Sequence, residues 1–133
     1  MINSPYQIYQ QSSVQTANGG QLIIMLYEGA IRFTKAGIEG IQTRNYEKAN
    51  TSLKKAQAII HELIAALNYD YEISKDLLQI YEYLLYQLIE SNMKKNEVMA
   101  HDVVAHLVEL RDVWKQVIKG PVSSETRIES GVK

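Results

Sequence analysis

The spacing of apolar residues between positions 46 and 67 constrains this chain most. Apolar side chains recur there at alternating intervals of three and four residues, the repeat of a helix that packs one face against its neighbours. They are Tyr46, Ala49, Leu53, Ala56, Ile60, Leu63 and Leu67. Asn45 stands just before this stripe, where an asparagine side chain can accept a hydrogen bond from a free amide of the first turn. The pattern predicts an amphipathic helix that begins after Asn45.

The helix after Asn45 is the second of four that we predict, and two further stripes of this kind follow it along the chain. A third predicted helix ends from Ser91 onward, and Asn96 can cap a fourth one that Gly120 and Pro121 should end. The only prolines are Pro5 and Pro121, so no proline interrupts either helix. The predicted core stripe of the third helix comprises Ile73, Leu77, Ile80, Tyr81, Leu84 and Leu88. That of the fourth comprises Met99, Val103, Leu107, Leu110, Trp114 and Val117.

The stretch TANGGQLIIMLYEGAIRF, residues 16–33, admits three interpretations because a turn signal precedes a continuous apolar run. A hairpin needs period-two alternation on both sides of the turn, which is missing here. A phosphate-binding loop needs further glycines and a lysine followed by serine or threonine, or a strand leading into it, and neither is present here. Asn18 and Gln21 have the spacing of a helix cap and its reciprocal partner. We therefore predict a first helix over residues 19 to about 41.

Four amphipathic helices joined by short connections predict an all-α, antiparallel up-down four-helix bundle. We expect a bundle domain over residues 16–120 and a flexible polar tail over residues 121–133. We expect residues 1–15 to form a separate N-terminal segment with a short amphipathic helical turn, because Tyr6 and Tyr9 have helical spacing around Ile8. That turn either extends the edge of the core or docks on an apolar groove.

The first and third helices have more apolar surface than one core stripe requires. On the first helix, one face comprises Leu22, Leu26, Ala30, Phe33 and Gly37. A second apolar arc, rotated by more than a quarter turn, comprises Ile24, Tyr27, Ile31 and Ile38. A helix in a broad bundle can contact two neighbours and bury both arcs. Two surplus arcs together favour an exposed partner-binding surface. The candidate partner-binding residues, which include two tyrosines of the N-terminal segment, are Tyr6, Tyr9, Ile24, Tyr27, Ile31, Ile38, Leu78, Tyr83 and Tyr86.

Composition narrows the classes of function. The formal net charge is -1, so no strong field attracts nucleic acid or an anionic membrane. The chain has no cysteine, which excludes disulfides and cysteine-ligated zinc. It also lacks a secretory signal and any apolar run of membrane-spanning length, so we expect no membrane insertion and a cytoplasmic location.

The three histidines do not form a recognisable catalytic or metal site. His101 and His106 are five residues apart, which does not place them on one face as paired ligands. A di-iron bundle needs Glu-x-x-His pairs, and none occurs. A phosphotransfer bundle needs an exposed histidine beside a basic residue and a glycine, a setting that no histidine here has. We therefore expect neither enzymatic activity nor a metal or other cofactor.

Five segments together resemble a known family in their order and spacing. They are YQQ at Tyr9, TANGGQLIIMLYEGAIRF, NYEKANTSLKKAQAIIHEL, LNYDYEISKDLLQIYEYLLYQLIESN and VVAHLVELRDVWKQV. These segments resemble the FliS family of flagellar secretion chaperones from about Tyr6 to Ile118. The most specific one is LYEGA at residues 26–30, supported by Glu72 with Ile73 and by Trp114. Asn18 with Gly19 departs from the Ser-Pro that family members usually have, although both versions can cap a helix.

The resemblance implies a cytoplasmic chaperone that binds the disordered C-terminal segment of flagellin. Such a chaperone prevents premature polymerisation and delivers flagellin, as a complex, to the flagellar export gate. Tyr6 and Tyr9 are similar to family positions that contact flagellin, whereas the other candidate residues follow from helical geometry. The main alternative is a self-associating bundle in which the surplus arcs pair subunits as a homodimer. A phosphotransfer protein is a further hypothesis, although the histidine setting that it needs is missing.

Overall fold

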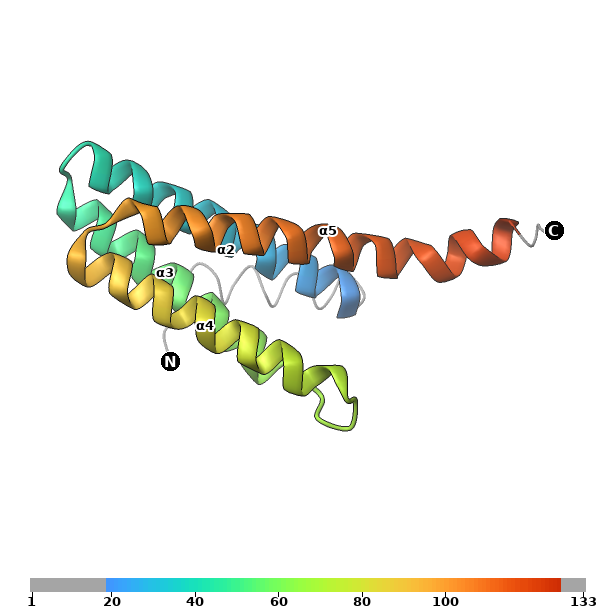
Figure 1. Cartoon of the computed structure of the whole chain (residues 1–133). Helices are drawn as coiled ribbons and strands as arrows, with labels where there is room; N and C mark the ends of the chain where they lie inside the picture. Colours follow the sequence, from blue (N-terminus) through green and yellow to red (C-terminus); the bar gives the residue numbers. More distant parts are fainter. Residues whose placement is uncertain (1–18, 128–133) are drawn as a thin grey trace, which may run out of the picture.

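The computed structural model describes residues 19–127, with side chains as far as Ile118, and this part of the chain forms four helices (Figure 1). They are α2 (Gly19–Gln42), α3 (Tyr46–Ala65), α4 (Ile73–Lys94) and α5 (Glu97–Arg127). Consecutive helices run in opposite directions, and α2 and α4 each pack against both α3 and α5. The predicted all-α four-helix bundle is confirmed. The N-terminal segment, with Tyr6 and Tyr9, lies outside the described residues.

Asparagine side chains begin two of the helices as predicted. The Asn45 side chain accepts a hydrogen bond from the backbone amide of Lys48 at 3.1 Å, and that of Asn96 accepts from Val98 at 2.9 Å. Between α4 and α5, Lys95 adopts a left-handed conformation, and its amide donates to the Ser91 carbonyl. The chain thus reverses within residues 95–96, and this short connection holds one end of α4 against α5.

Two predicted helix ends were wrong. The third predicted helix, expected to end from Ser91 onward, continues as α4 to Lys94. The fourth, α5, continues through Gly120 and Pro121 to Arg127. Proline fixes φ at a value that helices share, so the chain can remain helical with the loss of one hydrogen bond. Residues 121–127 are therefore part of α5, beyond the predicted helix end.

The core lies between all four helices, and α3 and α5 contact α2 more extensively than they contact α4. Helix α2 packs against both α3 and α5, which encloses it on two sides. The predicted stripe of the second helix is buried except at its ends: Tyr46 is 48% exposed, and Leu67 is half-buried. Fully buried side chains from the four helices include Leu26, Ala30, Leu53, Ile60, Leu63, Leu84, Leu88, Val103 and Leu107.

Glycines let α2 approach α3 closely at its C-terminal half. A Cβ atom added at Gly40 would lie 2.6 Å from the backbone nitrogen of Ala49, and one at Gly37 would lie 2.5 Å from a methyl group of Leu53. Real Cβ contacts are not this short, so the two helices are packed with no space left between them. This region brings the backbones together and leaves no groove.

Candidate functional site

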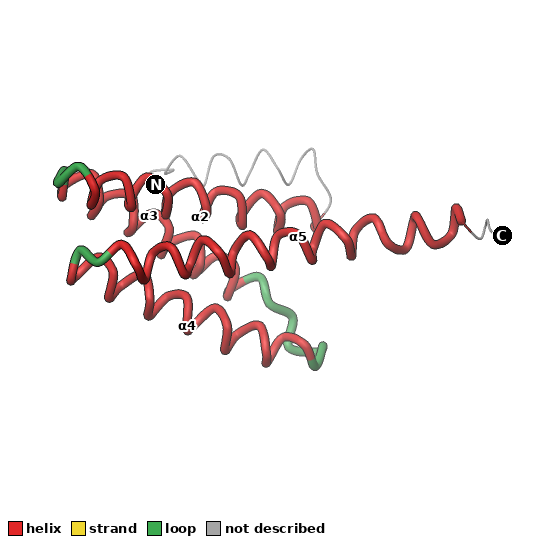
Figure 2. The backbone as a smooth tube through the Cα atoms, turned by 45° about the horizontal axis from the view of Figure 1, so that its top comes forward, coloured by secondary structure: helices red, strands yellow, loops and turns green. Residues whose placement is uncertain are grey.

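On the other side of the bundle, α4 and α5 diverge. They are close at the connection over residues 95–96 and separate toward the N-terminus of α4 at Ile73, as both views show (Figures 1 and 2). Their mutual contact is the least extensive among the four neighbouring helix pairs. The apolar stripes of α4 and α5 run past the point where the helices part. Side chains that the spacing assigned to the core are therefore left uncovered there.

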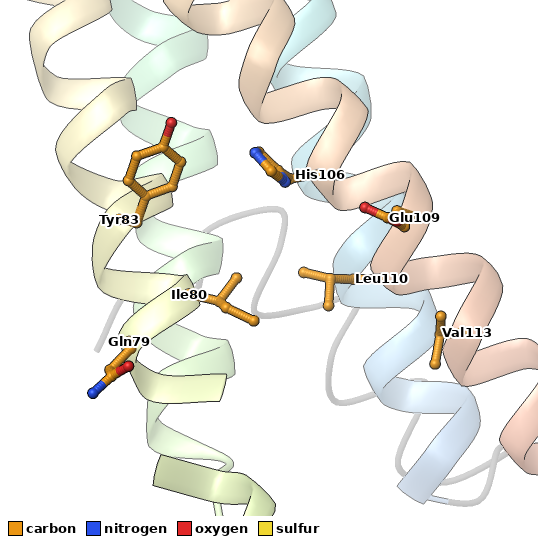
Figure 3. Close-up of a pocket in the computed structure, with 7 residues that line it drawn as sticks. All are labelled: Gln79, Ile80, Tyr83, His106, Glu109, Leu110 and Val113. Carbon is orange, nitrogen blue, oxygen red and sulfur yellow. The ribbon is translucent and has the colours of Figure 1, made fainter. Parts of the chain in front are cut away.

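The uncovered side chains line a groove of about 460 Å³ between the two helices (Figure 3). In the close-up, Ile80 of α4 and Leu110 of α5 face each other across it. Ile80 is 37% exposed and Val113 is 54% exposed, so solvent contacts apolar surface along the groove. We call this feature the α4–α5 groove, and it is lined by Gln79, Ile80, Tyr83, His106, Glu109, Leu110 and Val113.

Hydrogen bonds to Asp102 bridge α4 and α5 on the side of the groove where Tyr83 and His106 lie. The Tyr83 hydroxyl donates to the carboxylate of Asp102 at 2.8 Å, and the Gln87 amide donates to the same oxygen at 3.1 Å. The His106 Nε2 atom lies 3.5 Å from the other carboxylate oxygen, and its ring meets that of Tyr83 edge to face at 5.7 Å. The hydrogen bond to Asp102 raises the pKa of the Tyr83 phenol. Asp102 therefore ties the two helices together on this side.

A second hollow of about 200 Å³ lies beside the diverging part of α4 and is also mainly apolar. Leu77 and Tyr81 of α4 and Trp114 of α5 line it, together with residues of the α3–α4 connection. Ile73, at the first turn of α4, is 58% exposed at this hollow. The full lining comprises Ile23, Leu63, Ala66, Leu67, Asn68, Tyr71, Ile73, Ser74, Leu77, Tyr81 and Trp114.

Two buried tyrosines connect the second hollow to the core. The hydroxyl oxygens of Tyr27 in α2 and Tyr81 in α4 are 2.5 Å apart, and both side chains are almost completely buried. Burial raises the pKa of both phenols, because the charged form would lose its solvation. Each hydroxyl is thus satisfied, and the pair holds α2 against α4 beneath the hollow.

The structure contradicts the exposed position predicted for three candidate residues on the first helix. Tyr27 is 0% exposed, and Ile31 and Ile38 are each 6% exposed. Because α2 is enclosed by α3 and α5, its second arc serves as a second core face. Ile24, also on α2, is half-buried. Most of the second apolar arc of α2 is therefore buried inside the molecule.

The candidates on the third helix lie in different places. Tyr83 is 46% exposed and lines the α4–α5 groove. Tyr86 is exposed without lining either hollow, and Leu78 is half-buried outside both.

Several lining residues that the sequence did not identify as partner-binding had been predicted as core. Ile80 and Leu110 belong to the predicted core stripes and line the α4–α5 groove, while Ile73 and Trp114 line the second hollow. Their periodic spacing identified the correct helix face but not whether a neighbour covers it. For His106, no sequence signal pointed to the site.

In the part of the chain that the structure describes, no helix is long and apolar enough to cross a membrane. The same residues contain no group of three or more histidine, cysteine, aspartate or glutamate side chains arranged to hold a metal ion.

Comparison with known proteins places this arrangement in a family. Residues 1–121 match the family model described as flagellar protein FliS. The chain is 38% identical over 118 residues to the flagellar secretion chaperone FliS of Bacillus subtilis, covering 89% of each chain. It is 27% identical over 118 residues to the FliS of Escherichia coli, covering 86% of this chain and 87% of that one. The FliS of Salmonella typhimurium is 27% identical over 129 residues, covering 95% and 96% of the two chains.

Proposed function

The chain belongs to the FliS family of flagellar secretion chaperones, and on this premise we propose that its α4–α5 groove binds the disordered C-terminal segment of flagellin. Bound in the cytoplasm, that segment is kept from polymerising early. The complex is then delivered to the flagellar export gate. The protein acts by binding alone and uses no cofactor.

The observation that carries this proposal is the uncovered core stripe of α4 and α5. Ile80, Leu110 and Val113 present apolar surface on both walls of one groove. A groove of this kind suits an amphipathic helix that inserts its apolar face between two helices. Flagellin's terminal regions are amphipathic and form helices in the filament core, so in the monomer their apolar faces need a temporary partner.

Burial of a few apolar side chains is enough for useful affinity. Each aliphatic anchor that becomes buried contributes roughly 1.5–3 kcal/mol. A segment that folds as it binds loses conformational entropy, which offsets part of this gain. The second hollow lies next to the same diverging helices, and it offers room for a further anchor beside Trp114. Tyr6, Tyr9, Ile24, Leu78 and Tyr86 stay predictions as additional contacts, whereas Tyr27, Ile31 and Ile38 are too deeply buried to contact a client.

Calorimetry with a flagellin C-terminal peptide tests the proposal. We expect binding with a negative heat-capacity change, because apolar surface leaves water. Val113→Asp should weaken binding at least about tenfold, since a charge in the groove must be desolvated. Val98→Asp is the matched control: Val98 is also exposed on α5 but does not line the groove.

The outcomes separate the site from the function. No binding by the unmodified protein would refute the proposed function. Equal effects of the two aspartate substitutions would place the client elsewhere on the surface. Circular dichroism and urea unfolding of both variants check that neither has lost its fold.

A homodimer is the second candidate, because α4 exposes apolar side chains outside the groove. Tyr86 is 57% exposed, Ile89 38% and Met93 73%. Sedimentation velocity distinguishes the two functions: a dimer that persists when the flagellin peptide binds supports a structural role for this surface. A monomer at all concentrations rules it out.

A further inference from the structure

The α4–α5 groove contains one carboxylate without a partner among the described residues. Glu109 lines the groove from α5, next to Leu110 and Val113 (Figure 3). Its side chain is exposed and makes no hydrogen bond or ion pair with any residue that the structure describes. Across the groove, α4 presents the neutral amide of Gln79.

The cations of α5 already pair with other carboxylates. Over residues 97–118, α5 has only two cations: Arg111, whose Nε lies 3.1 Å from Asp112, and Lys115, whose ammonium lies 3.8 Å from Glu28 of α2. Asp102, the other carboxylate close to the groove, accepts hydrogen bonds from Tyr83 and Gln87. Glu109 is therefore the acidic group that remains free to meet a ligand.

The half of the molecule that contains the groove, residues 68–118, has a net negative charge, the same sign as the Glu109 carboxylate. Residues 68–118 contain nine acidic and five basic side chains, a formal charge of -4, whereas residues 19–67 contain four acidic and six basic side chains, a formal charge of +2. The groove thus lies on the negative half of the described bundle. A positively charged ligand is attracted to this side and away from α2 and α3.

We propose that the α4–α5 groove selects an amphipathic helix with a lysine or arginine beside its apolar stripe, and that Glu109 pairs with that cation. This inference rests on the proposed function, because it assumes that the groove is the client site. The apolar stripe would contact Ile80, Leu110 and Val113, while the flanking cation reaches the rim at Glu109. Such a pair determines which helix binds, and in which register and orientation, more than how tightly it binds.

Binding of the flagellin C-terminal segment to charge variants of the full chain tests the inference. Glu109→Gln should weaken binding by about two- to fivefold at low salt, the effect of one exposed ion pair. Glu109→Lys should weaken it further, and both differences should shrink as salt is added. Glu82→Gln and Glu82→Lys are matched controls, because Glu82 is an exposed glutamate of α4 that does not line the groove.

A charge exchange provides the sharper measurement. Each lysine or arginine of the segment is changed in turn to glutamate, and every variant is measured against Glu109→Lys. One of them should bind Glu109→Lys better than the unmodified segment does. Absence of any such rescue overturns the pairing.

Two results distinguish this inference from the proposed function. If Val113→Asp weakens binding and Glu109→Gln matches Glu82→Gln, the groove is the client site and the charge pairing is wrong. If none of these substitutions changes binding, the groove is not the client site, and both proposals fail.

Discussion

Along α2 and α3 the helices approach so closely that Gly40 lies against the backbone of Ala49, whereas α4 and α5 part after a short connection. Both halves have apolar stripes with the same spacing. In the first half a neighbouring helix covers each stripe, and the second arc of α2 is buried as well. In the second half, the apolar stripes of α4 and α5 continue beyond the region where these two helices contact each other. The comparison teaches that the same amphipathic pattern builds a core or a binding surface, depending on where the helices diverge.

The largest expected effect separates covered from uncovered positions on α4 itself. Leu84 is 0% exposed, so Leu84→Ala should lower the free energy of unfolding by about 2–5 kcal/mol. Ile80, one turn earlier, lines the groove, and Ile80→Ala should lower it by less than about 1 kcal/mol. Urea unfolding followed by circular dichroism measures both. Similar losses at the two positions would mean that the groove is closed in solution.

The close approach of α2 and α3 predicts the next effect. Gly40→Ala should lower the free energy of unfolding by about 1–3 kcal/mol, because the new Cβ would overlap the backbone of Ala49. Gly19→Ala adds the same methyl group to α2 where nothing lies within 4 Å, and it should leave stability unchanged or slightly raised. Urea unfolding compares the two variants, and a neutral Gly40→Ala would contradict the tight crossing.

The buried phenols predict sensitivity to alkali. The pKa of Tyr27 and that of Tyr81 are raised in the folded chain, so above about pH 10 the unfolded chain releases protons that the folded chain keeps. Stability is therefore unaffected by these groups at lower pH. Above it, stability falls by about 1.4 kcal/mol per pH unit for each phenol. Urea unfolding at about pH 9 and about pH 11 measures this slope on both sides of the ordinary phenol pKa. The double variant Tyr27→Phe, Tyr81→Phe should lose most of it, and an unchanged slope would assign the effect to other groups.

The smallest effect compares two tyrosines of α4. Tyr81→Phe removes the hydrogen bond to Tyr27 inside the core and should lower the free energy of unfolding by about 1 kcal/mol. Tyr83→Phe removes the bond to Asp102 at the exposed groove and should change it by less than about 0.5 kcal/mol. Thermal unfolding resolves the difference. A greater loss for Tyr83→Phe would show that the bridge to Asp102 determines the position of α4.

The helices and two of their caps were predictable because both depend on local chemistry, whereas the predicted cap Asn18 lies outside the described residues. The side chains of Asn45 and Asn96 accept the hydrogen bonds expected of caps. The end of the last helix was not predictable from Pro121 alone, since proline disfavours a helix without excluding it.

The site was predicted only in part, because coverage depends on how helices are arranged in space. The spacing placed Ile80 and Leu110 on the inner faces of their helices, where they lie. It could not show that α4 diverges from α5 and leaves them exposed. Spacing also could not show that a face is covered. The second apolar arc of α2 indicated an exposed surface at Tyr27, but α3 and α5 bury this side chain.

The angle that α4 makes with α5 at the connection over residues 95–96 determines how far apart the two helices are at Ile73. A helix of 22 residues is about 33 Å long, so a rotation of ~10° about this pivot moves the far end by roughly 6 Å. The same rotation barely shifts Ser91, which donates a hydrogen bond to Asn96 beside the pivot. The width of the α4–α5 groove therefore depends most on the tilt of α4 near Ile73, where the two helices are farthest apart, and least beside residues 95–96.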